Sequence, residues 1–222
     1  MKKNKINTVL QKLLDKNNDN NIKFIELSNG SYLNKLFGIQ FNFPADWFVL
    51  NREQVVNSAE NQLFVGEYEH HKEKFEINEL PALLITKYNP SLDKYYGLIS
   101  PTINFSIIPK HPDYLGLSLV EYADLIENAR HFGYHPLKNF RVLNKGELEK
   151  IDNFNSIIYK TEYLFEHEEL DFGIMVQMQV LNIDYEDFFL DFSMTDCLTQ
   201  NQKESRNFEN LIQSIKLNKH YG

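Results

Sequence analysis

Cysteine is almost absent from this chain of 222 residues, which contains only Cys197. One cysteine cannot close an intramolecular disulfide, and it cannot supply the paired thiolates of a cysteine-based zinc site. Cys197 lies between the last expected strand and the last expected helix, where a helix N-terminus could activate it as a nucleophile. Because a lone cysteine is more often a small buried apolar residue, we favour that interpretation.

Glycine is also scarce, with nine residues in the chain. The sequence has no Gly-x-Gly-x-x-Gly, no Gly-x-x-x-x-Gly-Lys and no Gly-x-Ser-x-Gly. These are the motifs of dinucleotide binding, of phosphate binding and of the hydrolase nucleophile. Their absence removes the usual reasons to propose an enzyme. We therefore expect a protein without catalytic residues, without a cofactor and without a bound metal ion.

No apolar run approaches the length of a membrane span. The apolar residues near the N-terminus are interrupted by Asn7, Gln11 and Lys12, unlike those of a secretory signal. Basic residues are too few to balance the acidic ones, since 23 Lys and Arg against 31 Asp and Glu leave a net charge of −8. Such a chain repels nucleic-acid phosphates and tolerates a basic protein partner. We expect a cytoplasmic protein that binds no nucleic acid and has no membrane span.

The first 21 residues are expected to form an appended element. Apolar residues at 6, 9, 10, 13 and 14 recur with the period of an amphipathic helix. The polar run at 17–21 ends this helix, since Asn and Asp favour turns over helix interiors. Residues 1–21 therefore read as a helix on a polar tether. This helix either docks on the body or binds a partner, and docking is the commoner arrangement.

Residues 22–222 are expected to form one domain with a charged insertion near 51–80. Alternating apolar residues predict strands over 39–43 and 103–107. A continuous apolar run predicts a further strand over 81–88. These segments would supply the first part of a sheet.

A helix is predicted after these strands. Ser118 and Glu121 have the spacing of a capping box, in which each side chain bonds to the backbone N–H of the other residue. Leu119, Tyr122 and Ala123 begin an apolar face along the helix. Glycine favours helix termination, so we expect the helix to end at Gly133.

The C-terminal third of the chain has the clearest period. Apolar residues alternate along three consecutive segments separated by polar turns, which is typical of an antiparallel meander with one buried face. A final amphipathic helix follows, and its apolar face should lie on the sheet. A short preceding strand is expected to end with residues 148–151, the three segments at 157–165, 172–180 and 188–194, the turns at 166–169 and 182–184, and the helix face at Phe208, Leu211, Ile212 and Ile215.

The order of these elements predicts an α+β protein with a central antiparallel sheet flanked by helices on both faces. An early strand ends in Pro44-Ala45-Asp46-Trp47, and the last helix ends in Ser214-Ile215-Lys216. The order and these two short motifs resemble the PsbP-like superfamily over about residues 30–217, with Asp46 where that family usually has glycine. The superfamily includes PsbP of photosystem II, a nuclear-transport factor that binds the GTPase Ran, and bacterial DcrB-like proteins. The resemblance implies an α/β/α sandwich that binds other proteins, with no catalytic residue to carry over.

One surface is a candidate for partner binding. Its five polar residues surround the expected turn between the first two strands of the meander, and a basic partner could dock there. The turn at the tip of a hairpin faces solvent and is polar in any case. We favour this structural explanation of the five polar residues over partner binding. The five residues are Glu166, His167, Glu168, Glu169 and Asp171.

Two groups of histidines were considered as metal ligands. His131 and His135 are four residues apart, but Gly133 and Pro136 interrupt the helix that would bring them together. An interaction of His131 with the helix dipole is the better interpretation. The second group shows no helical period, so a solvated charged loop is favoured over a zinc or manganese site. It comprises Glu67, Glu69, His70, His71 and Glu73.

The leading functional hypothesis is a non-catalytic protein-binding module, adaptor-like or chaperone-like. Its partner would be another protein, either basic or with an exposed hydrophobic segment. One alternative is an acidic immunity-type inhibitor of a basic toxin. A second alternative is an enzyme or small-molecule carrier with a pocket between sheet and helix. That pocket would be lined by Tyr95, Tyr96, Tyr122 and Tyr134. The oligomeric state is left open.

Overall fold

The computed structural model describes residues 24–51, 53–56, 81–89, 98–110, 114, 116–132, 137–166, 172–197 and 204–218. The chain divides into two compact units, residues 1–46 with 209–222 and residues 47–208. Each unit has its own antiparallel sheet. The expected helix within 1–21 and most of the expected insertion near 51–80 lie outside the described residues. The sequence predicts a single domain over 22–222, and this stays a prediction, because a division into compact units does not decide the number of domains.

The first unit contains a four-stranded sheet in the order β1-β2-β3-β11. Gly30 turns the chain between β1 and β2 with φ of 79°, and a Cβ there would lie 2.5 Å from the Phe43 carbonyl oxygen, so glycine is required. The rings of Tyr32 and Phe41 stack at 4.9 Å in the interior of this unit. The strands are β1 (Ile25–Ser28), β2 (Ser31–Asn34), β3 (Ile39–Asn42) and β11 (Lys216–Leu217).

Helix α4 (Ser205–Ser214) leads into β11, and the boundary between the two units falls within this helix. At its C-terminal end, Ser214 Oγ accepts a 2.8 Å hydrogen bond from the backbone N–H of Asn42. The final helix predicted from the sequence is therefore confirmed, whereas the two-residue strand after it was not predicted. Whether α4 lies on the meander remains a prediction.

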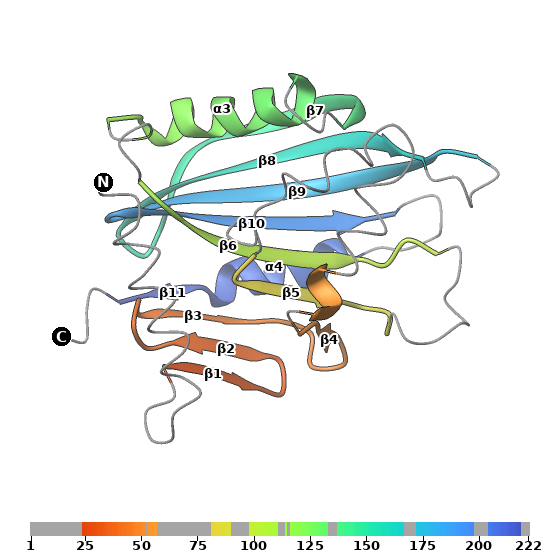
Figure 1. Ribbon diagram of the computed structural model, residues 1–222. Coiled ribbons are helices and arrows are strands. Elements are labelled where there is room, and N and C mark those ends of the chain that lie inside the picture. The colour runs from red at the N-terminus through yellow and green to blue at the C-terminus, as the bar shows by residue number, and fades with distance from the viewer. Residues whose placement is uncertain are drawn as a thin grey trace. The chain divides into compact units, whose positions relative to one another are not determined.

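The second unit contains a seven-stranded antiparallel sheet in the order β4-β5-β6-β10-β9-β8-β7 (Figure 1). The strands predicted over 81–88 and 103–107 are β5 and β6, and the predicted meander is β8-β9-β10. The strands are β4 (Phe48–Val49), β5 (Leu83–Thr86), β6 (Thr102–Pro109), β7 (Lys138–Ile151), β8 (Phe154–Phe165), β9 (Ile174–Tyr185) and β10 (Phe188–Asp196).

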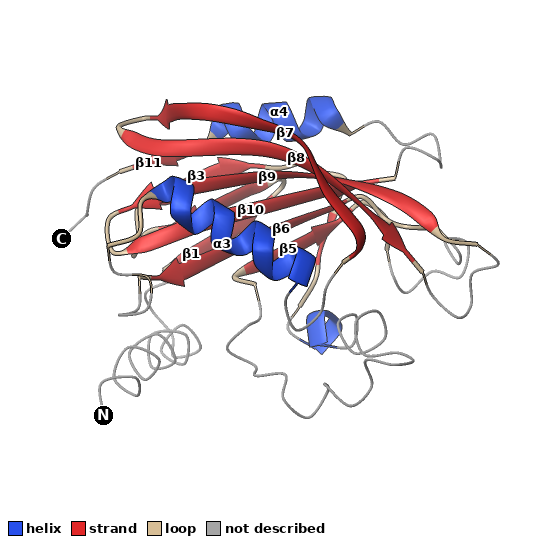
Figure 2. Cartoon of the chain, turned by 90° about the horizontal axis from the view of Figure 1, so that it is seen from above, coloured by secondary structure: helices blue, strands red, loops and turns tan. Residues whose placement is uncertain are grey.

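Helix α3 (Leu119–Phe132) lies across one face of this sheet and packs against β7, β8 and β9 (Figure 2). Its capping box is confirmed: the Ser118 N–H donates to Glu121 Oε2 at 2.8 Å, and the Glu121 N–H donates to Ser118 Oγ at 3.3 Å. The Ser118 N–H, together with the Ser118 hydroxyl that donates to the same oxygen at 2.7 Å, lowers the pKa of the Glu121 carboxyl. The inner side of α3 buries Leu119, Tyr122 and Ala123. A helix thus covers one face of the seven-stranded sheet, and a helix on its second face remains a prediction.

The prediction that the meander has one buried face is wrong. Tyr159 and Val180 are paired and belong to the cluster beneath α3. In β10, however, Phe192 pairs with Leu181 and therefore lies on the opposite face, because directly paired residues share a face. All four side chains are at most 1% exposed. The sheet therefore buries both of its faces at β9.

Three expected boundaries are corrected by the structure. The turn expected at 182–184 is part of β9, and the chain turns at Glu186-Asp187 instead. Phe172, assigned to the buried stripe of the second strand, is 73% exposed and precedes β9. The strand expected to end with residues 148–151 does end at Ile151, but it is long rather than short, because it begins at Lys138. Most of its side chains are exposed, so it leaves no apolar period in the sequence.

Candidate functional site

Strand β7 forms one edge of the seven-stranded sheet. It runs for 14 residues and, among the described residues, pairs only with β8. Its register with β8 shifts at three places, and it is regular from Leu148 to Ile151, opposite Ile157 to Phe154. Over this regular stretch the outer backbone groups of β7 have no strand beside them in the described part of the chain.

Gly146 permits the last of these register shifts, between Lys145 and Leu148. A Cβ at this position would lie 2.7 Å from the backbone oxygen of Ile158 on β8. That distance is too short for a side chain, and the obstacle is backbone rather than a flexible side chain. Glycine therefore lets the irregular part of β7 approach β8 closely.

Exposed apolar side chains accompany this edge. Leu148 is 54% exposed, Leu143 43% and Val142 38%. Exposed apolar side chains next to unpaired backbone groups favour pairing with a strand of another chain, and most edge strands carry features that prevent such pairing. The β7 edge therefore combines backbone groups that face no described strand with exposed apolar side chains, which are the features that favour addition of another strand.

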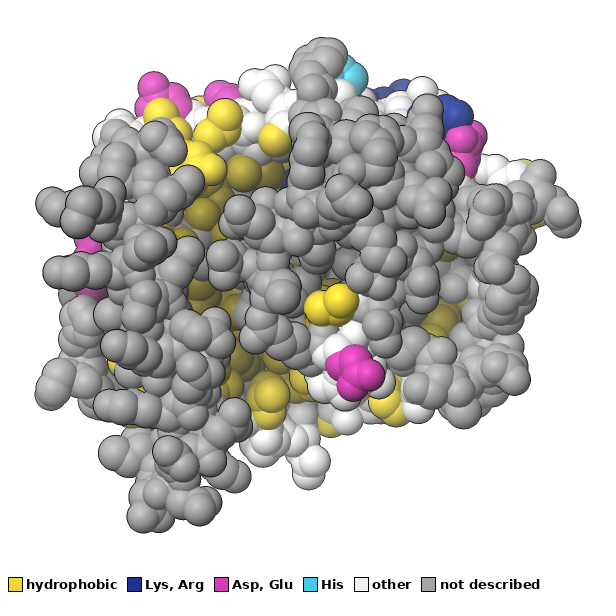
Figure 3. All heavy atoms as spheres, viewed as in Figure 1, with side chains coloured by type: hydrophobic (Ala, Val, Ile, Leu, Met, Phe, Trp, Pro, Cys, Tyr) yellow, Lys and Arg dark blue, Asp and Glu magenta, His cyan; other side chains and the backbone are white. Residues whose placement is uncertain are grey.

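Ion pairs already engage three of the basic residues of β7. Lys145 lies 2.5 Å from Asp124 and 3.0 Å from Glu127, both on α3. Lys138 and Arg141 pair with Glu166 and Glu162 on β8 and its end. On the face shown in Figure 3, basic side chains likewise lie next to acidic ones at the upper right.

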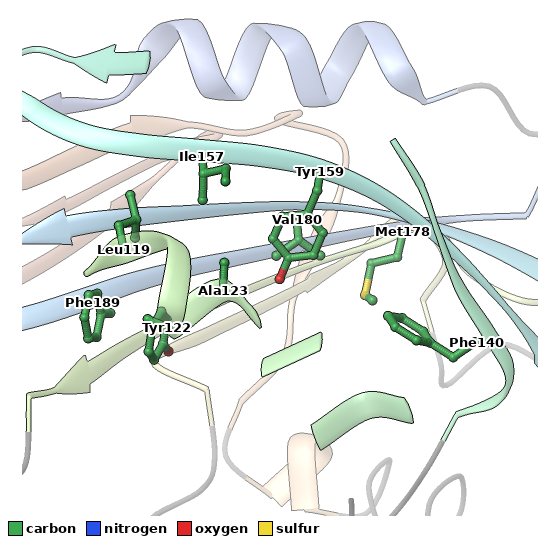
Figure 4. Close-up of a cluster of buried hydrophobic side chains, with 9 residues drawn as sticks. All are labelled: Leu119, Tyr122, Ala123, Phe140, Ile157, Tyr159, Met178, Val180 and Phe189. Atoms are coloured by element: carbon green, nitrogen blue, oxygen red, sulfur yellow. The ribbon is translucent and has the colours of Figure 1, made fainter. Parts of the chain in front are cut away.

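Beneath α3 lies a buried hydrophobic cluster that draws on the helix and on β7, β8, β9 and β10 (Figure 4). The Tyr122 ring stacks on Phe189 with centroids 3.8 Å apart. Tyr122 and Tyr159 also bring hydroxyl groups into this apolar layer, and buried hydroxyls require hydrogen-bond partners. The nine cluster residues are Leu119, Tyr122, Ala123, Phe140, Ile157, Tyr159, Met178, Val180 and Phe189.

Asp191 on β10 accepts bonds from two of its neighbours. The Tyr122 hydroxyl donates to Oδ2 at 2.7 Å, and Nδ2 of Asn182 donates to Oδ1 at 2.6 Å. Burial raises the pKa of the Asp191 carboxyl, and the two hydrogen bonds only partly oppose this. Burial, together with the neighbouring carboxylate, also raises the pKa of the Tyr122 hydroxyl.

Arg130, in the last turn of α3, extends this polar network. Its Nη1 donates to the Tyr159 hydroxyl at 3.3 Å, and its Nη2 donates to Ser193 Oγ at 3.0 Å. Burial raises the pKa of Tyr159, and the guanidinium charge opposes that shift. Burial also raises the pKa of Tyr163 to about 12, again against the nearby Arg130.

The residues predicted for partner binding are only partly described. Glu166 follows the end of β8, is exposed and pairs with Lys138 at 2.5 Å. The other four, His167, Glu168, Glu169 and Asp171, lie outside the described residues. The acidic surface at this turn therefore remains a prediction.

Of the residues weighed as metal ligands, His131 is the one that the structure describes. The cluster at 67–73 and His135 lie outside the described residues. His131 is exposed in the last turn of α3, and its ring lies 6.2 Å from that of Phe140. In the described part of the chain, no three potential ligand side chains gather into a metal site.

Of the four tyrosines considered for a pocket, only Tyr122 is described, and its hydroxyl is engaged by Asp191. Cys197 directly follows β10 and is 0% exposed, as expected of a small buried residue. Sequence reasoning missed Asp191 and Arg130. The available signal was Asp191 itself, a charged residue between Leu190 and Phe192 in a strand that is otherwise rich in apolar residues.

No family model matches the chain, and no curated protein matches it in sequence. Among solved structures, the cyanobacterial PsbP (CyanoP) of Synechocystis sp. PCC 6803 matches with a TM-score of 0.51 and 11% identity, covering 90% of this chain and 96% of its own. LpqN, involved in cell envelope biogenesis of Mycobacterium tuberculosis, matches with a TM-score of 0.47 and 10% identity, covering 82% of this chain and 83% of its own.

A protein of unknown function, PA94 from Pseudomonas aeruginosa, matches with a TM-score of 0.42 and 14% identity, over 55% of this chain and 75% of its own. The likeness to the cyanobacterial protein is one of fold, at an identity too low to carry function. The chain has a PsbP-like α+β fold built mostly from antiparallel sheet. None of the described helices is long and apolar enough to span a membrane.

Proposed function

We propose that the chain is a non-catalytic protein-binding module, adaptor-like or chaperone-like, which receives an extended segment of a partner protein along β7. The observation that carries the proposal is the edge position of β7 in the seven-stranded sheet. A segment that adds to a sheet edge gains main-chain hydrogen bonds, and its alternate side chains supply specificity.

The regular stretch from Leu148 to Ile151 is the part of β7 suited to such pairing. Elsewhere β7 has register shifts and basic side chains. Both features prevent an edge strand from pairing with another strand. A partner segment would therefore be short. Leu148 is 54% exposed, so covering it completely contributes about 1 kcal/mol to binding.

Charge indicates the chemistry of the partner. Glu147 and Glu149 flank Leu148, are exposed, and form no ion pair with another described residue. By contrast, three of the four basic residues of β7, Lys138, Arg141 and Lys145, are already neutralised by acidic neighbours, and Lys150 is the one that forms no ion pair with another described residue. We therefore propose an extended partner segment with basic residues on either side of an apolar one, as complementary charges favour association. The net charge of −8 supports the same choice.

The absence of catalysis is part of the proposal. It is supported by the lack of nucleotide-binding and hydrolase motifs in the sequence. It is also supported by the surroundings of Asp191, a described carboxyl whose pKa is raised by burial. Both of its oxygens accept hydrogen bonds from side chains of the protein, as a structural carboxylate does.

The proposal can be tested by affinity capture from a lysate of the source organism, with quantitative mass spectrometry. The chain is compared with two variants, Leu148→Lys on β7 and Leu27→Lys on β1. Leu27 is a matched control, because it is 47% exposed and lies on the edge strand of the other sheet. We expect a specific protein to be captured by the unmodified chain and by Leu27→Lys, with recovery reduced about tenfold by Leu148→Lys. Equal recovery by all three folded proteins, or no specific recovery at all, would contradict the proposal.

A further inference from the structure

Strands β6 and β10 carry polar side chains at paired positions on the α3 face of their sheet. Asn104 lies opposite Ser193, and Ser106 lies opposite Asp191. This is the α3 face, because Asp191 and Ser193 bond to side chains of that helix. We name the six paired side chains the polar strip; they are Thr102, Asn104, Ser106, Asp191, Ser193 and Thr195, and all are partly exposed.

The polar strip differs from the rest of this face. Further along the sheet order, the same face of β8 and β9 contributes Ile157, Tyr159, Met178 and Val180 to the apolar cluster that α3 covers. Polar side chains at a helix–sheet layer are unfavourable unless they find hydrogen-bond partners. Because the strip side chains remain partly exposed, they can still reach solvent or a bound molecule.

Arg130 projects a cation into this region. A guanidinium has five N–H donors. Two of them donate to the neutral hydroxyls of Tyr159 and Ser193. The Asp191 carboxylate accepts its hydrogen bonds from Tyr122 and Asn182 rather than from Arg130, although the guanidinium charge is near enough to oppose the rise in its pKa that burial causes. Three guanidinium donors are therefore uncommitted to any described side chain.

This lack of a carboxylate partner sets Arg130 apart from the other partly buried cations of the unit. The side chains of Lys110, Lys145 and Lys87 are 18%, 27% and 34% exposed, and each forms an ion pair with an Asp or Glu. Arg130 is likewise partly buried, yet no described carboxylate lies within ion-pair distance. Partly desolvated cations are normally paired in direct contact, and Asp191 acts on Arg130 only from a greater distance, so the unused donors point to an anion supplied from outside.

We infer that Arg130 and the polar strip form a binding site for a small molecule that carries a carboxylate or phosphate group. The planar fork of a guanidinium matches two oxygens of either group. Tyr159 and Ser193 hold the fork through its other donors. Thr102 and Thr195 hydrogen-bond to each other and Ser106 donates to Asn104 Oδ1, which leaves the amide NH₂ of Asn104 for the rest of the ligand. The site is independent of the partner-binding edge, because no residue of the strip lies on β7.

The test uses ¹⁵N-labelled protein and the Nε–H signals of its arginines in a nuclear magnetic resonance titration. The chain has four arginines, Arg52, Arg130, Arg141 and Arg206, so each signal can be assigned by substitution. Inorganic phosphate and acetate are titrated separately, and sodium chloride is the reference for ionic strength. Arg141 is the internal control, because it is exposed and pairs with Glu162.

We expect a saturable shift of the Arg130 signal with phosphate, with acetate or with both, at concentrations about tenfold below any effect on Arg141. A response to phosphate alone assigns a phosphate-bearing ligand, and a response to acetate alone assigns a carboxylate. Arg130→Met should abolish the thermal stabilisation by the same anion, whereas Arg141→Met should retain it. No saturable shift with either anion, or equal shifts at Arg130 and Arg141, would overturn the inference even if Arg130→Met does not fold.

Discussion

The hydroxyl of Tyr122 on α3 donates a 2.7 Å hydrogen bond to Oδ2 of Asp191 on β10. This bond joins the helix to the sheet by a polar contact beside a buried apolar cluster. Asn182 on β9 donates a second hydrogen bond, to Oδ1 of the same carboxylate. The charge of Asp191 is therefore stabilised by two oriented donors in direct contact and by the more distant charge of Arg130.

Asp191 should give the protein a specific dependence of stability on pH. Burial raises its pKa in the folded chain above the ordinary value of 3.8. Between these two pKa values the native state binds more protons than the unfolded state, so the free energy of unfolding falls as pH rises through that interval and is level above it. Asp191→Asn removes this contribution.

Urea unfolding of both proteins at a series of pH values measures the effect. The free energy of unfolding of the unmodified chain minus that of Asp191→Asn should decrease as the pH rises from the acidic side, then become constant. Taking the difference cancels the other titrating groups. A difference that increases with pH would contradict the environment described for Asp191.

Removing the Tyr122 hydroxyl should destabilise the chain. Tyr122→Phe keeps the ring that stacks on Phe189 but leaves Asp191 without one donor, and the loss should be about 1–3 kcal/mol in the free energy of unfolding. Tyr114→Phe is the matched control, because that ring packs against Tyr122 but its hydroxyl forms no described hydrogen bond. Chemical denaturation should show that Tyr114→Phe changes stability by less than about 0.5 kcal/mol. Equal effects of both substitutions would argue against the bond.

Gly146→Ala should weaken the β7–β8 pairing. The added methyl group would lie 2.7 Å from the Ile158 backbone oxygen, so the two strands must separate locally, at about 1–3 kcal/mol. Gly173→Ala is the control, because its methyl group would meet the end of the flexible Leu164 side chain instead. Thermal or urea unfolding that ranks Gly173→Ala as the more damaging substitution would contradict this account of the edge.

The ion pair of Lys87 with Glu204 should matter more than a surface pair. The Glu204 side chain is 8% exposed, and Lys87 lies 2.5 Å from it. Lys87→Met leaves a buried carboxylate without its cation and should cost about 2–4 kcal/mol. Lys35→Met is the matched control, because Lys35 and Glu26 are 49% and 46% exposed, and its loss should cost less than about 1 kcal/mol. Similar losses for both variants in urea unfolding would refute this ranking.

Much of the fold could be predicted from local patterns. The Ser118 capping box, the alternating residues of β6 and the apolar face of α4 each follow from a period or a spacing within one segment. Strand β7 could not be predicted in full, because an edge strand exposed along most of its length has no apolar alternation. The short strands β1, β2 and β11 contain too few residues to show a period.

Strand β9 shows why periodicity misled. Its buried apolar residues occupy even positions up to Val180 and odd positions from Leu181, where both faces are buried. In the sequence this change of face resembles the end of a strand, so Asn182 was expected in a turn. In the structure Asn182 pairs with Asp191 and is 0% exposed.

The polar network was beyond sequence reasoning for a different reason. Arg130, Asn182 and Ser193 each resemble ordinary surface residues when read along the chain. Only the register of β10 with β9 and β6, together with the packing of α3, brings them to one place. That register depends on pairings between segments far apart in the sequence, and no local pattern encodes it.

Amide hydrogen exchange of the chain, alone and in complex with the protein it captures, tests the binding edge most directly. Addition of a partner strand to β7 should slow exchange over Leu148–Ile151, because outer backbone groups that face no strand of the described chain would become hydrogen-bonded. Exchange over β1, the edge of the four-stranded sheet, should be unchanged. Unchanged exchange at Leu148–Ile151 in a saturated complex, with protection appearing elsewhere, would contradict the account.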